Sequence, residues 1–288
     1  EINLGLDNDI FCFNVESAVE LEIINELAAA KNKVASIALR INPEVDAHTH
    51  AKITTGMKEN KFGINLSQLG GVLDKLKEMK HVKLIGIHSH IGSQITDMSS
   101  FRNLVIRFNE IQEELEAHGV TVENLNFGGG LGIDYYHPNH LSIPAFDNYF
   151  AAIHKLLQVR PGQQVHFEPG RSIVAQCGTL ISKVLYVKEG ETKKFAILDA
   201  GFTELIRPAM YDAYHRIENI SSDEAVETYD VVGPICESSD VFGKDVELNK
   251  AHRGDLIALR SAGAYGEVMA SQYNCRHLPK AYYSDTIK

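Results

Sequence analysis

The stretch Val82 to Gln94 reads V-K-L-I-G-I-H-S-H-I-G-S-Q, an apolar run that ends in two histidines and a glycine-containing polar loop. Short apolar runs bounded by turn residues are typical of strands that are buried in a parallel sheet. In a barrel of β/α units, reactive side chains lie where such strands end and loops begin. The stretch therefore predicts a strand over Val82 to His90 whose carboxyl end carries chemistry.

Similar apolar runs occur on both sides of this stretch, separated by amphipathic segments. The predicted strands are Ile10 to Val15, Ala35 to Asn42, Val82 to His90, Val122 to Gly128 and Val165 to Glu168. Ser17, with Glu20 three residues later, has the form of a capping box that opens the first helix between them. This alternation predicts β/α units around a parallel sheet. Five units cannot close an eightfold barrel, so we expect a partial α/β (TIM) barrel made of its last five units, with the others upstream of Glu1.

The pattern changes after Arg171, where runs rich in β-branched and aromatic residues alternate with turns. The runs are Leu180 to Val187, Lys194 to Leu198, Glu227 to Val232 and Asp255 to Arg260, and the turns contain Gly190, Gly233, Gly243 and Gly254. A polar excursion over Arg207 to Ser222 interrupts them. We therefore predict an all-β, barrel-like domain over 178–288, after a partial barrel domain over 1–177.

Charge and composition exclude several classes of partner. Acidic residues outnumber basic ones by 38 to 28, so a net charge of −10 argues against nucleic acid or an anionic membrane as the main partner. The chain lacks both the ~18-residue apolar run of a membrane helix and the pattern of a signal peptide, which favours a cytoplasmic protein. Its cysteines form no Cys-x-x-Cys pair, so neither a zinc site nor a disulfide framework is expected.

Two further strand ends carry unusual sequences. Phe127 to Gly132 reads F-G-G-G-L-G, and Phe167 to Arg171 reads F-E-P-G-R. Glycines at a strand end let the backbone approach a ligand and turn N–H groups toward a phosphate, although a tight turn that needs positive φ explains them equally well. Glu168 is costly to bury without a partner. Either Arg171 is that partner, or Glu168 holds a proton on the nitrogen of a heteroaromatic cofactor.

The histidines and cysteines differ in their sequence surroundings. If both lie on the strand, His88 and His90 share a face, but no further ligand at metal spacing joins them, so we expect a buried, hydrogen-bonded His88 and a His90 that meets a ligand. His48 and His50 lie in a polar loop and are expected to be solvated. Cys236 differs from the other cysteines because the polar residues Glu237 and Asp240 follow it closely. The other three cysteines are expected to be inert.

Taken in order, the motifs resemble the diaminopimelate decarboxylases, which are pyridoxal-phosphate enzymes with an alanine-racemase-like barrel and a β domain. The resemblance runs from about Phe11 to Leu278. Its motifs are R-I-N-P-E-V-D at Arg40 to Asp46, T-G-M-K-E-N-K-F-G at Thr55 to Gly63, H-I-G-S-Q at His90 to Gln94, G-G-G at Gly128 to Gly130, E-P-G-R at Glu168 to Arg171, R-P-A-M-Y at Arg207 to Tyr211, C-E-S-S-D at Cys236 to Asp240 and G-A-Y-G at Gly263 to Gly266.

The resemblance implies a role for each residue of a cofactor site. Pyridoxal phosphate would be held by Ser93, Gly128, Gly129, Gly130, Tyr265 and the segment Glu168, Pro169, Gly170 and Arg171. His90 would stack on the pyridine ring, and Glu168 would pair with its nitrogen. No metal is implied.

The resemblance also implies the reaction and its substrate. The family decarboxylates meso-diaminopimelate to L-lysine, the last step of lysine biosynthesis. Arg171, Arg207, Tyr211 and Tyr265 would bind the substrate, with the two arginines and Tyr211 on its unreactive carboxylate, and Glu237 would bind its ammonium group. Cys236 is implied as the proton donor. In this family Cys236 and Glu237 come from the second subunit, which implies a homodimer with shared active sites.

One family element is missing, because no lysine lies in the Tyr-Ala-Val-Lys-like strand segment that supplies the Schiff-base lysine. We therefore expect the chain by itself to be inactive, and the lysine to lie upstream. Two alternatives stay open. The protein could be a related decarboxylase that acts on ornithine, arginine or a carboxylated polyamine such as carboxynorspermidine, or a catalytically dead homologue with a regulatory binding role.

Overall fold

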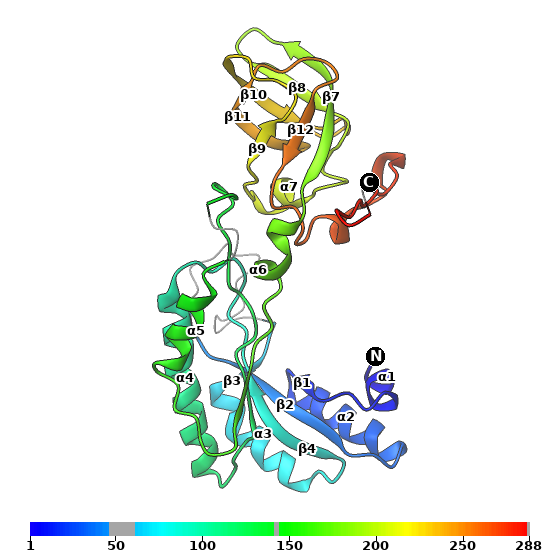
Figure 1. Cartoon of the computed structure of the whole chain (residues 1–288). Coiled ribbons are helices and arrows are strands. Elements are labelled where there is room, and N and C mark those ends of the chain that lie inside the picture. Colours follow the sequence, from blue (N-terminus) through cyan, green and yellow to red (C-terminus); the bar gives the residue numbers. More distant parts are fainter. Residues whose placement is uncertain (46–60, 141–143, 287–288) are drawn as a thin grey trace. The chain divides into compact units, whose positions relative to one another are not determined.

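The computed structural model describes residues 1–45, 61–140 and 144–286. The contacts between residues divide the chain into two compact units (Figure 1). The first unit is Glu1–Gly132 with Ala145–Pro169, and the second is Ile133–Pro144 with Gly170–Lys288. His48, His50 and most of the motif Thr55 to Gly63 lie outside the described residues.

A parallel sheet forms the centre of the first unit. Its strands are β1 (Phe13–Val15), β2 (Ala35–Asn42), β3 (Ile64–Asn65), β4 (Val82–His88), β5 (Asn124–Asn126) and β6 (Gln164–His166). Neighbouring strands follow in the order β1-β2-β4-β5-β6, all parallel, and β3 pairs with the end of β2. Each of the five strands predicted from the sequence is present, so the prediction of consecutive β/α units is confirmed.

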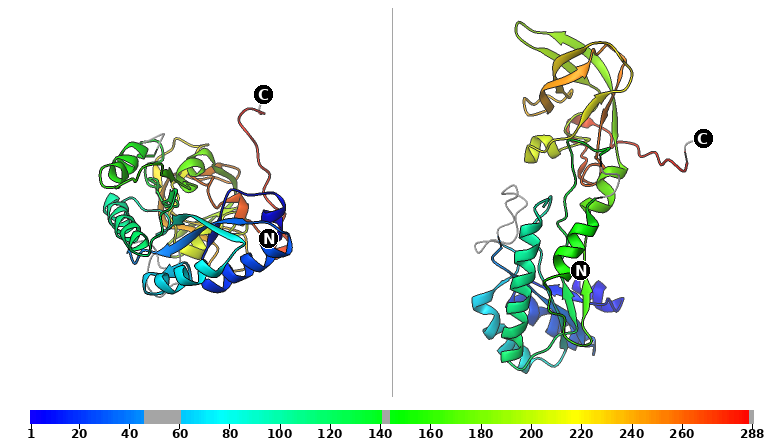
Figure 2. Two further views of the ribbon diagram at one scale, coloured as in Figure 1. Left: turned by 90° about the horizontal axis from the view of Figure 1, so that it is seen from below. Right: turned by 60° about the vertical axis from the view of Figure 1, so that its left-hand side comes forward.

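Helices cover the outer face of this sheet, as the left view of Figure 2 shows. They are α1 (Ile2–Asp7), α2 (Ala18–Ala30), α3 (Leu66–Glu78), α4 (Met98–Ala117) and α5 (Phe146–His154). The predicted cap of α2 is confirmed, because the hydroxyl of Ser17 accepts the N–H of Glu20. The Glu20 carboxylate accepts the N–H of Glu16, one residue before the position that a standard capping box would use.

Strand β4 ends at His88, two residues earlier than predicted. The N–H of Ser89 still donates to the carbonyl of Asn126, but the Ser89 hydroxyl then bonds to the carbonyl of Ile41, and the chain leaves the ladder. His88 and His90 therefore do not share one strand face: His88 is the last residue of β4, and His90 belongs to the loop that follows.

The second unit is built on one curved sheet. After α6 (Arg171–Val174), its elements are β7 (Leu180–Glu189), β8 (Lys194–Leu198), α7 (Arg207–Tyr211), β9 (Ile217–Asn219), β10 (Val226–Val232), β11 (Val241–Asn249) and β12 (Leu256–Leu259). The strand order is β11-β10-β8-β7-β12-β9, and all pairs are antiparallel except β8 with β10. The edge strands β9 and β11 contact each other, so the sheet nearly closes, as predicted for a barrel-like domain.

Two details of this unit differ from the sequence prediction. The polar excursion contains β9, which forms because Ile217 is buried and pairs with Leu259 of β12. Gly243 lies inside β11 rather than in a turn. It pairs with Val231, where the register with β10 shifts, and a Cβ there would come within 2.7 Å of the Val246 side chain. Glycine in a strand interior commonly marks such an irregularity.

The division between the units also differs from the predicted boundary after residue 177. Ile133 and Tyr135, from the segment after the glycine loop, pack with Ala175 and Ala264 in one small apolar cluster. The N–H of Gly263 donates to the carbonyl of Ala175. Burial of these side chains together places 133–144 and 170–177 in the second unit.

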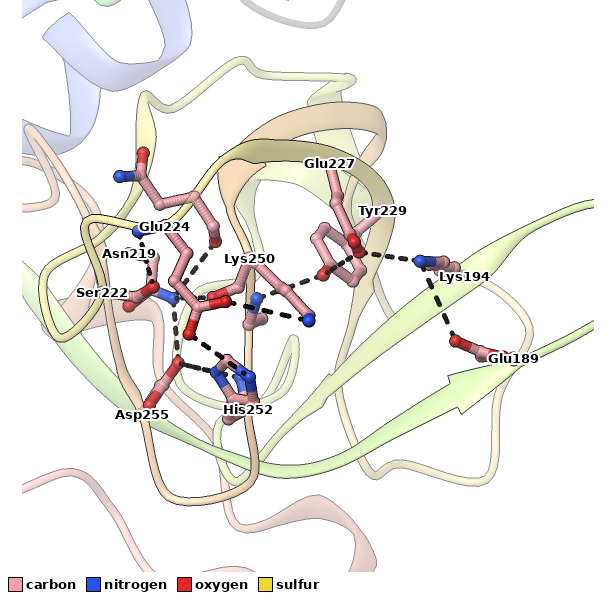
Figure 3. A network of polar contacts seen from close by, with 12 residues as sticks. Glu189, Lys194, Asn219, Ser222, Glu224, Glu227, Tyr229, Lys250, His252 and Asp255 are labelled. Atoms are coloured by element: carbon pink, nitrogen blue, oxygen red, sulfur yellow. Dashed lines mark hydrogen bonds and ion pairs between the residues drawn. The ribbon is translucent and has the colours of Figure 1, made fainter.

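A network of polar contacts joins the strand ends of the second unit away from the family motifs (Figure 3). The Asn219 amide donates to Asp255, and Lys250 and His252 form ion pairs with Glu224. Nearby, Glu227 accepts hydrogen bonds from Lys194 and Tyr229. Most of these groups are solvated, so each pair contributes little to stability, and the network mainly fixes the loops.

None of the helices in the described ranges is both long and apolar enough to span a membrane.

Candidate active site

The ends of β4, β5 and β6 bring three predicted motifs together in the first unit. These strands are direct neighbours, with His88 opposite Asn126 and Asn126 opposite His166. The carboxyl ends of neighbouring parallel strands meet at one edge of a sheet. The loop after β4 therefore lies beside the glycine loop after β5, which in turn lies beside Glu168.

The glycine loop allows a backbone approach that no other residue would permit. Gly128 and Gly130 have φ of +62° and +110°, in the left-handed region. A Cβ on Gly129 would come within 2.3 Å of the Glu168 carbonyl oxygen, and one on Gly130 within 2.7 Å of the Gly92 carbonyl oxygen. Turn geometry and close packing of neighbouring backbones therefore both require these glycines, and their role in binding a phosphate stays a prediction.

Two of the glycine N–H groups are already bound within the unit. The N–H of Gly128 donates to Oδ1 of Asn126 at 2.9 Å, and the N–H of Gly129 donates to Nδ1 of His90 at 3.1 Å. The loop that carries Ser93 is fixed to the same turn, because the N–H of Ile95 donates to the Gly130 carbonyl. The turn thus connects His90, Ser93 and the glycines into one rigid edge.

Glu168 takes its polar partners from the first unit. The Asn126 amide donates to its Oε1 at 2.7 Å, and Nε2 of His88 lies 3.6 Å from its Oε2. Contact with the His88 imidazole, against the opposing effect of burial, holds the pKa of Glu168 down to about 2. The carboxylate is 47% exposed and is therefore a charged group that a ligand can reach.

His90 is neutral, whereas His88 is buried without the hydrogen bonds predicted for it. Burial, followed by the charge of Arg40, lowers the pKa of His90 to about 4. Its Nδ1 accepts the Gly129 N–H, so the proton of the neutral ring is on Nε2. Neither ring nitrogen of His88 has a hydrogen-bond partner among the described residues, and the 3.6 Å from its Nε2 to Oε2 of Glu168 is just beyond hydrogen-bond distance.

In the second unit, two buried arginines flank one aromatic ring. Arg171 and Arg207 are 6% and 5% exposed, and both guanidinium groups lie over the ring of Tyr135, at 5.9 and 5.0 Å. Nη1 of Arg171 also donates to the Tyr135 hydroxyl at 2.6 Å. Tyr211 lies one helical turn after Arg207 in α7, on the same face. The sequence prediction did not include Tyr135, although it follows the glycine loop closely.

No carboxylate of the described residues forms an ion pair with Arg207. Its Nη1 contacts Nε2 of His215 at 2.8 Å instead. Burial lowers the pKa of Arg207 below its usual value. A buried cation without a counter-ion is costly, so this position is suited to an anionic ligand. His215 was not identified from the sequence, because it lies within the stretch interpreted as a polar excursion.

The segment A-G-A-Y-G brings Tyr265 to the same arginine cluster. The Arg171 guanidinium lies 4.9 Å from the centre of the Tyr265 ring. Tyr265 has a φ of +57°, which is unusual for a bulky residue. The loop is forced to this shape by close packing, since a Cβ on Gly263 would come within 2.0 Å of the Val174 carbonyl oxygen. Strain of this kind is typical of functional sites.

The loop that contains Cys236 and Glu237 is exposed. Glu237 accepts a hydrogen bond from the Tyr273 hydroxyl at 2.7 Å. The sequence predicts Asp240 as a polar neighbour of Cys236, and this is wrong. Asp240 is buried under the loop and accepts hydrogen bonds from the N–H groups of Phe202 and Ile235. Its role is therefore to fix the base of this loop.

Within the described parts of the chain, no three or more His, Cys, Asp or Glu side chains are grouped to hold a metal ion.

Comparison with known proteins identifies the family. Residues 1–175 match the model of the family described as pyridoxal-dependent decarboxylase, pyridoxal binding domain. The chain is 67% identical to the diaminopimelate decarboxylase of Bacteroides thetaiotaomicron, over 100% of this chain and 74% of that protein. It is 44% identical to that of Haemophilus influenzae, over 96% and 66%. The chain thus spans about two thirds to three quarters of the length of these relatives.

Solved structures agree with the sequence comparison. The diaminopimelate decarboxylase of Helicobacter pylori, crystallised in complex with L-lysine, has a TM-score of 0.88 and 40% identity, over 95% of this chain and 68% of that one. A second structure with L-lysine, from M. jannaschii, has a TM-score of 0.86 and 41% identity, over 96% and 64%. By sequence and by fold, the chain belongs to the diaminopimelate decarboxylase family of pyridoxal-dependent decarboxylases.

Proposed function

We propose that the enzyme containing this chain decarboxylates meso-diaminopimelate to L-lysine with pyridoxal phosphate. The observation that carries the proposal is the 67% identity to a diaminopimelate decarboxylase along the whole chain. The structure of an arginine decarboxylase from Paramecium bursaria Chlorella virus resembles this chain at 21% identity, which reflects the fold alone. The alternative substrates therefore have weaker support.

The residues of the first unit fit the cofactor. The glycine turn has no room for side chains, Glu168 is an exposed and ionised carboxylate, and His90 is a neutral aromatic ring on the same edge of the sheet. We assign the phosphate to Ser93 and Gly128–Gly130, the ring face to His90 and the pyridine nitrogen to Glu168. The N–H groups of Gly128 and Gly129 would then exchange their acceptors, Asn126 and His90, for the phosphate. Pyridoxal phosphate, when bound, supplies a sink for the electron pair left as carbon dioxide departs. Glu168 would hold the proton on that nitrogen.

The buried arginines support the substrate assignment. Diaminopimelate carries a second amino-carboxylate end that does not react, and guanidinium groups match carboxylates in geometry and charge. We assign this carboxylate to Arg171, Arg207 and Tyr211, because Arg207 is buried and no described carboxylate neutralises it. Tyr265, which contacts Arg171, is assigned to the cofactor phosphate and the substrate.

The remaining assignments concern a second subunit. We propose a homodimer in which Cys236 donates the proton to the substrate carbon and Glu237 binds the ammonium group at the unreactive end, both in the partner's active site. Their exposure supports this, since neither side chain is enclosed by its own unit. The cytoplasmic location inferred from the sequence remains a prediction.

Replacing Cys236 by alanine tests the proton donor. We expect turnover to slow by about 10²-fold or more, because a positioned acid commonly contributes that much. Cys177→Ala is the matched control, since Cys177 is equally exposed in the same unit. Unchanged rate and product distribution would remove Cys236 from the mechanism.

Extending the chain to include the lysine that binds the cofactor covalently tests whether residues 1–288 are sufficient for activity. None of its lysines has the expected strand context, so we propose that residues 1–288 alone do not decarboxylate diaminopimelate, whereas a chain extended upstream to include that lysine does. Carbon dioxide release should be measured for both chains with added pyridoxal phosphate. Equal turnover would refute the proposal, and an inactive extended chain would favour the dead homologue.

A further inference from the structure

We infer that His215 is a positioning residue that orients Arg207 toward an anionic group of the substrate. The inference rests on the proposed function, in which Arg207 binds the carboxylate at the unreactive end. It deepens that proposal by identifying a side chain that touches neither cofactor nor substrate. All contacts of His215 named below lie within the second unit.

The two partners of His215 fix one neutral form of its ring. Nδ1 lies 2.9 Å from the carbonyl oxygen of Arg260, which can only accept, so Nδ1 carries the proton. Nε2 lies 2.8 Å from Nη1 of Arg207, which can only donate, so Nε2 is the acceptor. His215 is 1% exposed, and this burial lowers its pKa to about 4. The ring is therefore neutral at physiological pH and compatible with the adjacent cation.

Packing leaves the imidazole little freedom to move. Its ring meets the edge of Tyr135 at 5.2 Å in a T-shaped arrangement, and Tyr135 also lies against Arg207. The residue that follows α7, Asp212, has a φ of +51°, in the left-handed region. This conformation turns the backbone back toward the helix. A residue shortly after the helix can thus face Arg207, its first residue.

The arrangement explains how a long cation is held in place without neutralising it. A carboxylate at the position of His215 would satisfy Arg207 and compete with the substrate. A neutral acceptor fixes one guanidinium nitrogen and leaves the positive charge available. Removing this acceptor while keeping Arg207 should loosen the guanidinium and weaken binding of a ligand carboxylate, with little change in the chemistry at the reacting carbon.

Two substitutions separate this role from a merely structural one. In His215→Asn, the side-chain amide can still donate to the Arg260 carbonyl, but no acceptor reaches Arg207. In His215→Gln, the amide oxygen can take the place of Nε2. His252→Asn is the matched control, because His252 is half exposed in the polar network of the same unit (Figure 3).

The test measures kcat and KM for meso-diaminopimelate in the complete enzyme loaded with pyridoxal phosphate. We expect His215→Asn to raise KM for meso-diaminopimelate by about 10-fold to 100-fold, the range for a hydrogen bond to a charged group, with kcat and Tm nearly unchanged. His215→Gln should restore KM to within a few-fold, and His252→Asn should match the wild type.

Several outcomes would overturn the inference. They are an unchanged KM in His215→Asn, a loss of kcat accompanied by a lower Tm, or a glutamine variant as defective as the asparagine variant. If the wild-type enzyme does not turn over meso-diaminopimelate at all, the proposed function fails first, and the inference fails with it. The two failures are thus distinguishable.

Discussion

Replacement of Arg207 by alanine is expected to lower kcat/KM for meso-diaminopimelate by about 10³-fold to 10⁴-fold. A site built to bind a charged group discriminates strongly against a ligand or a variant that leaves that group unpaired. Arg207 is buried, and no described carboxylate pairs with it, so its loss removes a cation that the substrate would neutralise. The preference over lysine and ornithine should collapse at the same time.

The control and the measurement follow from the same geometry. Arg216→Ala removes a guanidinium that is about half exposed and paired with Glu218 in the same unit, and it should change kcat/KM little. Steady-state rates with all three amino acids should be compared for both variants. If Arg207→Ala retained the wild-type preference, the carboxylate would be recognised elsewhere.

Glu168→Gln is expected to reduce kcat by about 10²-fold to 10³-fold while the cofactor stays bound. Loss of one preorganised electrostatic contact to a developing charge typically has an effect of this size. The amide is nearly the same shape, so Asn126 can still donate to its oxygen, and the glycine turn is undisturbed. What is lost is the negative charge, which the low pKa of Glu168 maintains in the wild type throughout the working pH range.

Cofactor absorbance and rate must be followed together in this experiment. Glu123→Gln is the matched control, because Glu123 is an exposed carboxylate beside β5 that has only a long ion pair, 3.9 Å, with Lys83. Loss of cofactor absorbance in step with loss of rate would mean that Glu168 stabilises the site and does not tune the cofactor.

Local sequence signals predicted much of the fold. Five of the six strands of the first unit are apolar runs buried by the sheet and its helices, and the Ser17 cap is a purely local hydrogen bond. The short strands β3 and β9 and the glycine-containing β11 were missed. Strands of two or three residues, such as β3 and β9, are too short to show an alternating pattern, and the glycine at position 243 predicts a turn where β11 continues.

In the candidate site, too, the sequence predicts some residues and misses others. Residues in strand-end motifs, such as His90, Gly129 and Glu168, were predictable because their chemistry and spacing are unusual within a few residues. Tyr135 and His215 were not predictable, because their roles depend on contacts with residues distant in the sequence or not recognisable from it. Tyr135 contacts the guanidinium group of Arg171, and His215 contacts that of Arg207. Nothing close to His215 in the sequence indicates that it is buried.

A competition assay of the complete enzyme, with meso-diaminopimelate, lysine and ornithine and with pyridoxal phosphate present, tests the central claim most directly. The two arginines near Tyr135 predict rapid turnover of meso-diaminopimelate and negligible turnover of the other two, because neither lysine nor ornithine carries the second carboxylate. A value of kcat/KM for ornithine comparable to that for meso-diaminopimelate would contradict the account and favour a decarboxylase of another basic amino acid.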